Sequence, residues 1–150
     1  MGLIHLDAGV IIGFLDASDA HHQTSRAALA AALQQGDHLA LAASALAESL
    51  VGPARRGEPA VQAVRSLVER LPISIIPLDI EIATTAARLR AVHRTLRLPD
   101  ALVIATAIEH AADHLVTTDR RWPTAKALKY SGTISDGRLL RRPRAHRPRP

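Results

Sequence analysis

Four acidic side chains stand at positions where a parallel α/β fold would gather a ligand: Asp7, Glu48, Asp100 and Asp119. Asp7 closes the apolar run LIHLD and Asp119 closes HLVTTD, while Glu48 lies one turn beyond LALAAS. Asp100 follows Leu-Pro at the head of a very apolar segment. The carboxyl ends of parallel strands meet at one edge of the sheet, so residues far apart in sequence converge there. We therefore expect these acids to meet.

Carboxylates that meet need a cation or raised pKa values. Two of them about 4 Å apart repel by roughly 4 kcal/mol at an effective dielectric constant of about 20. Oxygen ligands suit Mg²⁺ and Mn²⁺ better than zinc, which prefers nitrogen and sulfur, and the chain has no cysteine. The four acids thus predict a site for Mg²⁺ or Mn²⁺.

Three of the acids also have a purely structural interpretation. Asp7 suits the N-cap of a following helix, where its side chain accepts a backbone hydrogen bond. Asp100, after Pro99, suits the dipole of a helix start. Asp119 can form a turn and pair with Arg120 or Arg121. One shared metal, in contrast, explains all of these positions together.

Glu48 is harder to explain as a structural residue, and its alternative is a surface charge. A capping box with Ser44 would need Glu or Gln at position 47, which is Ala47. The surrounding residues are apolar: Ala45, Leu46, Ala47, Leu50 and Val51. This setting favours a functional carboxylate over a surface charge, so the case for a metal rests most heavily on this residue.

Short apolar runs alternate with longer alanine- and leucine-rich segments along the chain. The runs LIHLD, LALAAS, ISIIPLD and HLVTTD are typical of strands buried in a parallel sheet, and 129–135 is a further, shorter candidate. Helical patterns cover 20–35, 44–56, 59–71, 80–97 and 100–113. This alternation predicts a three-layer α/β/α fold with a short, mostly parallel central sheet flanked by helices.

The net charge of +5 arises from the basic residues at the end of the chain. Six arginines fall in 138–150, and 1–137 carry 13 basic and 14 acidic residues, hence a net charge of −1. We therefore expect one domain at 1–137 and a disordered Arg/Pro-rich tail at 138–150. The tail is either a solubilising extension or an arm that contacts RNA in a salt-dependent way.

Several classes of function are disfavoured. The chain lacks GxGxxG, GxxxxGK[ST] and GxSxG, and without cysteine it has no thiol nucleophile. It has neither a signal-peptide pattern nor the roughly 18 continuous apolar residues of a membrane span, which predicts a soluble cytoplasmic protein. The run HAADH has a spacing that could bind zinc, but histidines at a helix end explain it better. The adjacent His21 and His22 are interpreted as solvated residues at a helix start.

The ordered motifs resemble the PIN-domain ribonucleases, particularly the VapC-type toxins of bacterial toxin–antitoxin pairs. The resemblance runs through LDAGVIIGFLD (6–16), ALAESL (45–50), LPDALVIATAIEH (98–110) and LVTTDRRW (115–122). It implies that Asp7, Glu48, Asp100 and Asp119 are the family's metal-binding acids, with Thr117 helping to hold the site. The chain departs from the pattern at Ala8-Gly9, where the family often has Thr-Ser, so a hydroxyl is missing there.

The resemblance implies metal-dependent hydrolysis of RNA phosphodiester bonds, a homodimer and inhibition by a cognate antitoxin. Asp7, Asp100 and Asp119 would bind metal, and Glu48 could orient water from an outer shell. With only Phe14, Trp122 and Tyr130 as aromatic residues, a stacking platform is not expected. Recognition would then use basic residues such as Arg55, Arg56, Arg120 and Arg121. The alternatives are a catalytically silent PIN-like module that binds RNA or protein, and a hydrolase of small phosphate esters.

Overall fold

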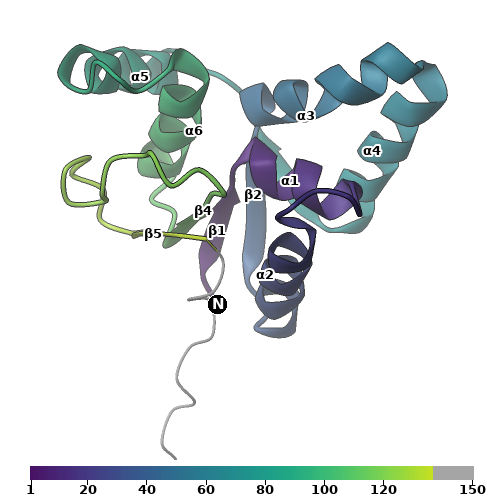
Figure 1. Ribbon diagram of the computed structural model, residues 1–150. Helices are drawn as coiled ribbons and strands as arrows, with labels where there is room; N and C mark the ends of the chain where they lie inside the picture. The colour runs from purple at the N-terminus through teal and green to yellow at the C-terminus, as the bar shows by residue number, and fades with distance from the viewer. Residues whose placement is uncertain (137–150) are drawn as a thin grey trace, which may run out of the picture.

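The structure is a computed structural model that describes residues 1–136, and the observations below concern these residues. The predicted tail at 138–150 and the last residue of the predicted domain at 1–137 lie outside them. The elements are, in chain order, β1 (Leu3–Leu6), α1 (Ala8–Leu15), α2 (His22–Gln34), β2 (His38–Ala42), α3 (Ala43–Arg56), α4 (Glu58–Arg70), β3 (Ile73–Ile76), α5 (Ile80–Val92), α6 (Leu98–Glu109), β4 (His114–Val116) and β5 (Thr133–Ser135). Figure 1 shows their arrangement.

The sheet has five strands in the order β3-β2-β1-β4-β5, and every pairing is parallel. This confirms the predicted parallel α/β fold, including a last strand within 129–135. The chain steps from β1 to β2 to β3 in one direction and then crosses back to β4 on the other side of β1. The carboxyl ends of β1 and β4 are therefore the point where the strand order reverses, which is where ligands bind in open α/β sheets.

Helices cover both faces of the sheet, as predicted. Parallel crossovers are almost always right-handed, so a reversal in strand order moves the connecting helices to the opposite face. Accordingly, α5 and α6 lie on the other side of the sheet from α1 and α2 (Figure 1). No helix in the described part of the chain is long and apolar enough to cross a membrane.

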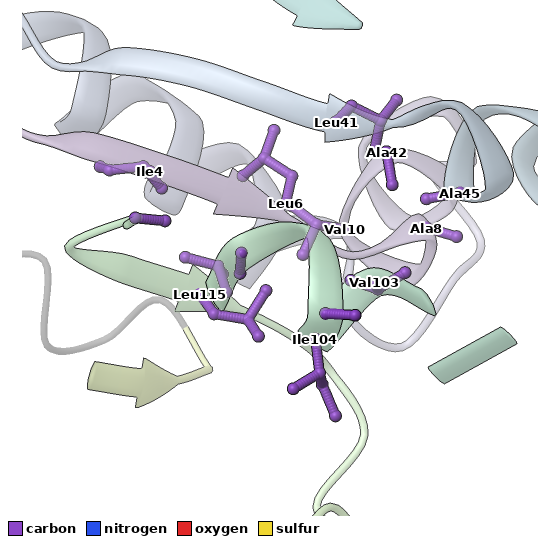
Figure 2. Close-up of a cluster of buried hydrophobic side chains, with 14 of the residues drawn as sticks. Ile4, Leu6, Ala8, Val10, Leu41, Ala42, Ala45, Val103, Ile104 and Leu115 are labelled. Carbon is purple, nitrogen blue, oxygen red and sulfur yellow. The ribbon is translucent and has the colours of Figure 1, made fainter. Parts of the chain in front are cut away.

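Buried alanines anchor the helices that carry the acids. Ala8, Ala45 and Ala101 are at most 2% exposed, and they lie next to or within three residues of Asp7, Glu48 and Asp100. In Figure 2, Ala8, Ala42 and Ala45 lie together where α1 and α3 leave the strands. A side chain this small lets helix and strand backbones approach closely. The close packing then fixes where each neighbouring acid emerges.

Two predicted helices are shorter than expected. The helix predicted at 80–97 ends at Val92, because His93 has a non-helical backbone and its carbonyl accepts from the N–H of Leu96 in a turn before α6. The helix predicted at 100–113 begins at Leu98 and ends at Glu109. Ala111 takes a left-handed conformation with φ 48°, and the N–H of Ala112 bonds the carbonyl of Ala107 at 2.9 Å. This turn leads directly into β4. The helices predicted at 20–35, 44–56 and 59–71 are confirmed to within two residues.

Candidate active site

Asp7 lies at the point where the strand order reverses. Its backbone N–H donates to the carbonyl of Val116 at the end of β4, with an N–O distance of 2.9 Å. Its Oδ1 accepts from the N–H of Ala8 at 2.8 Å, so the side chain caps α1 as the sequence suggested. The residue is only 7% exposed. The carboxylate is thus held between β1, β4 and the start of α1.

Thr117 joins two of the acids. Its hydroxyl donates to Oδ2 of Asp7 at 2.8 Å and accepts from the backbone N–H of Asp119 at 3.0 Å. The hydroxyl is buried, because Thr117 itself is 5% exposed. One side chain at the end of β4 therefore fixes both the carboxylate that follows β1 and the loop that carries Asp119.

The pKa of Asp7 is raised from its ordinary 3.8 to about 6. Burial is the main cause, and the negative charges of Asp100 and Glu48 raise it further. The hydrogen bonds from Thr117 and Ala8 act in the opposite direction without cancelling the effect. Asp100 and Glu48 are therefore close enough to Asp7 to oppose its ionisation, which places three of the four acids in one region.

Asp100 stands in the first turn of α6, as predicted, with 17% of its side chain exposed. The Nε of Arg97 lies 3.7 Å from its Oδ2. Glu48 lies on α3 and is exposed. The apolar surroundings expected for Glu48 are only partly buried, because Ala47 and Val51 share its exposed face. A carboxylate in this position is accessible to a ligand or to water.

Glu48 also lines a cavity of about 550 Å³ between α1, α3 and α4. Ile12, Leu15 and Val64 supply apolar walls, and Arg56 lies with them. The exposed side of the acid cluster thus continues into an apolar groove.

Asp119 is paired with Arg121. Nε and one terminal nitrogen of Arg121 bond the two carboxylate oxygens at 3.0 and 2.8 Å, and the backbone N–H of Arg121 bonds Oδ1 at 2.9 Å. These contacts hold the pKa of Asp119 below its usual value. The alternative in which Asp119 forms a turn and pairs with a neighbouring arginine is therefore observed, in the same residue that the metal hypothesis uses.

The donor set suits a hard divalent cation in its chemistry, since every candidate ligand is a carboxylate oxygen. Within 1–136, however, no three His, Cys, Asp or Glu side chains are arranged as a ready-made metal cluster. The carboxylates of Asp7 and Asp119 instead face hydrogen-bond donors of the protein. Binding of a cation by Asp119 would compete with its contacts to Arg121.

The surroundings of Gly9 give a structural reason for Ala8-Gly9, where the chain departs from the family's Thr-Ser. A Cβ placed at Gly9 would collide with the hydroxyl oxygen of Thr118 and would lie 3.9 Å from Oδ2 of Asp7. The hydroxyl of Thr118 therefore occupies the space that a side chain at position 9 would need. Sequence reasoning missed Thr118, and only the run of two threonines before Asp119 could have drawn attention to it.

The histidine-rich run HAADH forms hydrogen bonds with residues of the sheet. Oδ2 of Asp113 accepts from the N–H of Leu3 at 2.7 Å, and Nδ1 of His114 lies 3.0 Å from the hydroxyl of Thr133. The run spans the end of α6 and the start of β4, as the interpretation without zinc expected. His22 is less solvated than expected, because its Nδ1 lies 2.8 Å from the carbonyl of Gly13.

The candidate RNA-contacting arginines differ in their surroundings. Arg55, Arg56 and Arg120 are exposed, and Arg56 lines the groove beside Glu48. Arg121 is 82% exposed and pairs with Asp119. Arg120 and Arg121 thus stand beside the acids, whereas Arg55 and Arg56 lie at the far end of α3.

Comparison with known proteins gives one family. The model of the PIN domain matches residues 4–128. No curated protein matches the chain in sequence. Among solved structures, VapC20 of Mycobacterium tuberculosis, a toxin that cleaves the sarcin–ricin loop, is 18% identical with a TM-score of 0.62, covering 79% of this chain and 91% of its own.

Two toxin–antitoxin structures are similar to the same extent. VapBC-1 of nontypeable Haemophilus influenzae is 17% identical with a TM-score of 0.64, covering 90% of this chain and 98% of the other. VapBC2 of Rickettsia felis, bound to a DNA fragment from its promoter, is 17% identical with a TM-score of 0.62, covering 89% and 97%. At these identities the likeness concerns the fold.

Proposed function

Because the chain belongs to the PIN domain family, we propose that it is a Mg²⁺- or Mn²⁺-dependent endoribonuclease, a VapC-type toxin neutralised by a cognate antitoxin. The observation that carries the proposal is the environment of Asp7. This carboxylate lies at the point where the strand order reverses, and its pKa is raised by burial and further by the charges of Asp100 and Glu48. A fold keeps such a cluster at a cost in stability, and a divalent cation would offset that cost.

Each residue has a role that follows from its position. Asp7, Asp100 and Asp119 would hold the cation through carboxylate oxygens, and Thr117 keeps Asp7 and the Asp119 loop in register through its two hydrogen bonds. The exposed Glu48 orients water from an outer shell. When bound, the cation would supply a water of lowered pKa and would offset negative charge on the phosphate oxygens.

The substrate is RNA, bound mainly through its backbone. Arg120 is exposed next to Asp119, and Arg121 becomes available for a phosphate once Asp119 takes part in cation binding. Arginine suits this task, since its planar guanidinium donates two parallel hydrogen bonds to a phosphate. Cleavage should therefore weaken as the salt concentration rises.

The antitoxin would occupy the groove between α1, α3 and α4. The groove is apolar along Ile12, Leu15 and Val64 and ends at Glu48, so a helix with an apolar face could fill it and reach the acids. Solved toxin–antitoxin complexes have the same fold as this chain. A homodimer in the cytoplasm remains part of the proposal, as expected from the sequence.

The test is Mg²⁺-dependent cleavage of an RNA pool by wild type and Asp100→Asn, with Glu69→Gln as the matched control. Glu69 is an exposed carboxylate on α4, and its substitution removes one charge without touching the site. We expect cleavage by wild type and Glu69→Gln, none by Asp100→Asn, and none by any of the three proteins in EDTA. Equal cleavage by Asp100→Asn and wild type would refute the site.

A second candidate is a catalytically silent PIN-like module that binds RNA or protein. Two observations favour it: the absence of a side chain at Gly9, and the pairing of Asp119 with Arg121. In that case wild type would bind RNA in Mg²⁺ and leave all of its ends unchanged. Mapping of RNA ends after incubation with purified protein separates the two functions.

A further inference from the structure

A second cavity, of about 440 Å³, lies beside the acids at the carboxyl ends of β4 and β5. Thr117 and Asp119 form part of its wall, so it directly adjoins the candidate active site. The groove next to Glu48 adjoins the same site from α3. A strand of RNA whose phosphate reaches the acids would therefore place a neighbouring nucleotide at the β4–β5 cavity.

The wall of this cavity combines a flat ring with hydrogen-bonding edges. Trp122, Pro123 and Ile134 supply apolar surface, and Thr124 and Asp136 supply polar atoms beside them. The volume lies in the range of about 300–1,000 Å³ that is typical of small-molecule sites. Proteins that read single-stranded RNA commonly stack a splayed base on an aromatic side chain and bond its edges. The lining therefore suits a nucleobase with its ribose.

The ring is fixed before any ligand arrives. Trp122 packs against the hydrophobic core and is only partly exposed. The loop after it is fixed too, since the N–H of Leu128 bonds the carbonyl of Thr124 at 3.0 Å and the hydroxyl of Tyr130 bonds the carbonyl of Ala112. A preformed surface loses little conformational entropy on binding, so even one stacked base contributes to affinity. Stacking of one base on one ring does not require the platform of several aromatic residues that the sequence lacks.

We propose that the β4–β5 cavity binds one nucleobase of the RNA substrate, that of a nucleotide adjoining the cleaved bond, against the ring of Trp122. The proposal rests on the ribonuclease function above and adds to it a source of base preference. Carboxylates only accept hydrogen bonds, and each has room for several, so Asp136 can take a base amino group besides its present partners. Adenine, cytosine and guanine carry such a group, and uracil does not.

Trp122 is the only tryptophan, so its fluorescence reports on this cavity alone. The first experiment titrates the full-length Asp100→Asn protein with AMP, CMP, GMP, UMP and ribose 5-phosphate. We expect saturable quenching by at least one of the three amino-bearing nucleotides, weaker quenching by UMP, and none by ribose 5-phosphate. Equal quenching by ribose 5-phosphate, strongest quenching by UMP, or no quenching by any nucleotide would overturn the proposal.

The second experiment maps RNA ends cut by wild type, Trp122→Phe, Trp122→Ala and Phe14→Ala. Phe14 also packs against the core but does not line this cavity, so its loss controls for packing. Loss of one stacked base should reduce kcat/KM by about tenfold and relax the preference at one nucleotide beside the cut, while Trp122→Phe retains most of both. An unchanged preference in Trp122→Ala would contradict the proposal. If Trp122→Ala does not fold, Trp122→Phe and the titration remain decisive.

The two experiments also separate this proposal from the nuclease assignment. Nucleotide quenching without any cleavage by wild type would refute the nuclease and retain the base site. Metal-dependent cleavage that Asp100→Asn abolishes, without quenching by any nucleotide, would retain the nuclease and refute the base site.

Discussion

Replacing Asp7 by asparagine should stabilise the metal-free protein although it removes a ligand of the proposed cation site. Asp7 is 7% exposed, and its pKa is raised from 3.8 to about 6. The folded state therefore disfavours the charged form by about 3 kcal/mol, since each pKa unit corresponds to about 1.4 kcal/mol. Asparagine has nearly the same shape and carries no charge, so it escapes this cost.

The hydrogen bonds reduce the gain without reversing it. The asparagine Oδ1 can still accept from Ala8 and keep the cap of α1. Its amide nitrogen faces the hydroxyl of Thr117, which must turn from donor to acceptor, at a cost of about 1 kcal/mol. The expected net stabilisation is about 2 kcal/mol, or roughly 4–8 °C in Tm for a chain of this length.

The pH dependence identifies the cause. A carboxyl with a raised folded-state pKa destabilises the fold above pH 6, and this cost disappears as the pH falls from about 6 towards 3.8. The stabilisation of Asp7→Asn relative to wild type should therefore be full at pH 7.5 and lost near pH 4, where the hydrogen-bond cost of about 1 kcal/mol leaves the variant slightly less stable than wild type. Contributions from titrating groups that do not interact with Asp7 cancel, because both proteins contain them.

The assay is urea unfolding in EDTA at both pH values, repeated at pH 7.5 with saturating Mg²⁺. A hundredfold excess of Mg²⁺ over its Kd would stabilise wild type by about 2.7 kcal/mol and Asp7→Asn far less. The stability difference between the two proteins should therefore disappear or change sign. The reasoning would be refuted if Asp7→Asn were the less stable protein in EDTA at pH 7.5. A pH-independent gain would also refute it, since it would show that charge is not the cause.

Three further predictions concern residues around the site. His5 is fully buried, neither ring nitrogen has a hydrogen-bond partner within 1–136, and burial together with the charge of His110 lowers its pKa to about 4. The free energy of unfolding of wild type should thus fall by about 3 kcal/mol as the pH falls from 6.5 to 4. His5→Leu should abolish this fall and stabilise the protein at pH 7. Urea titrations in which His5→Leu loses as much stability in acid as wild type would contradict this. Gly9→Ser should lower the free energy of unfolding by about 1–3 kcal/mol, because the new side chain collides with Thr118. Adding Thr118→Ala should recover this stability, and a double-mutant cycle without coupling would exclude the collision. Arg121→Ala should lower the Kd for Mg²⁺ by about two- to fivefold, most clearly at low salt, because Asp119 no longer has to leave a cation; weaker Mg²⁺ binding would show that Arg121 assists the site.

Much of this architecture could be predicted from the sequence. Apolar runs ending in acids predicted the parallel strands and the edge at which Asp7 and Asp119 emerge, because burial on both faces leaves a strong signal. Asp100 could be placed at a helix start from Pro99 alone. The ends of α5 and α6 could not be placed. The turn after α6, which ends at Glu109, uses Ala111 in a left-handed conformation that sequence patterns assign to glycine.

The surroundings of the acids were harder to predict than their positions. Apolar neighbours of Glu48 suggested a buried setting, yet part of that apolar surface is exposed on α3. Sequence cannot distinguish a surface that packs in the chain's own core from one left open for a partner. The contact between Gly9 and Thr118 joins segments about 110 residues apart, and only the strand pairing of β1 with β4 brings them together.

The arrangement of charges indicates how the acids of the proposed site are held before a cation binds. Asp7 is held by the donors Ala8 and Thr117, which keep a buried carboxylate in place although burial and its acidic neighbours oppose ionisation. Asp119 is held by Arg121, which is exposed and can leave at little cost. Asp7 is therefore fixed and destabilising, whereas the charge of Asp119 is compensated by an arginine that can leave it. Cation binding would relieve the first and release the arginine of the second beside an incoming phosphate, so that metal binding and RNA binding should be positively coupled.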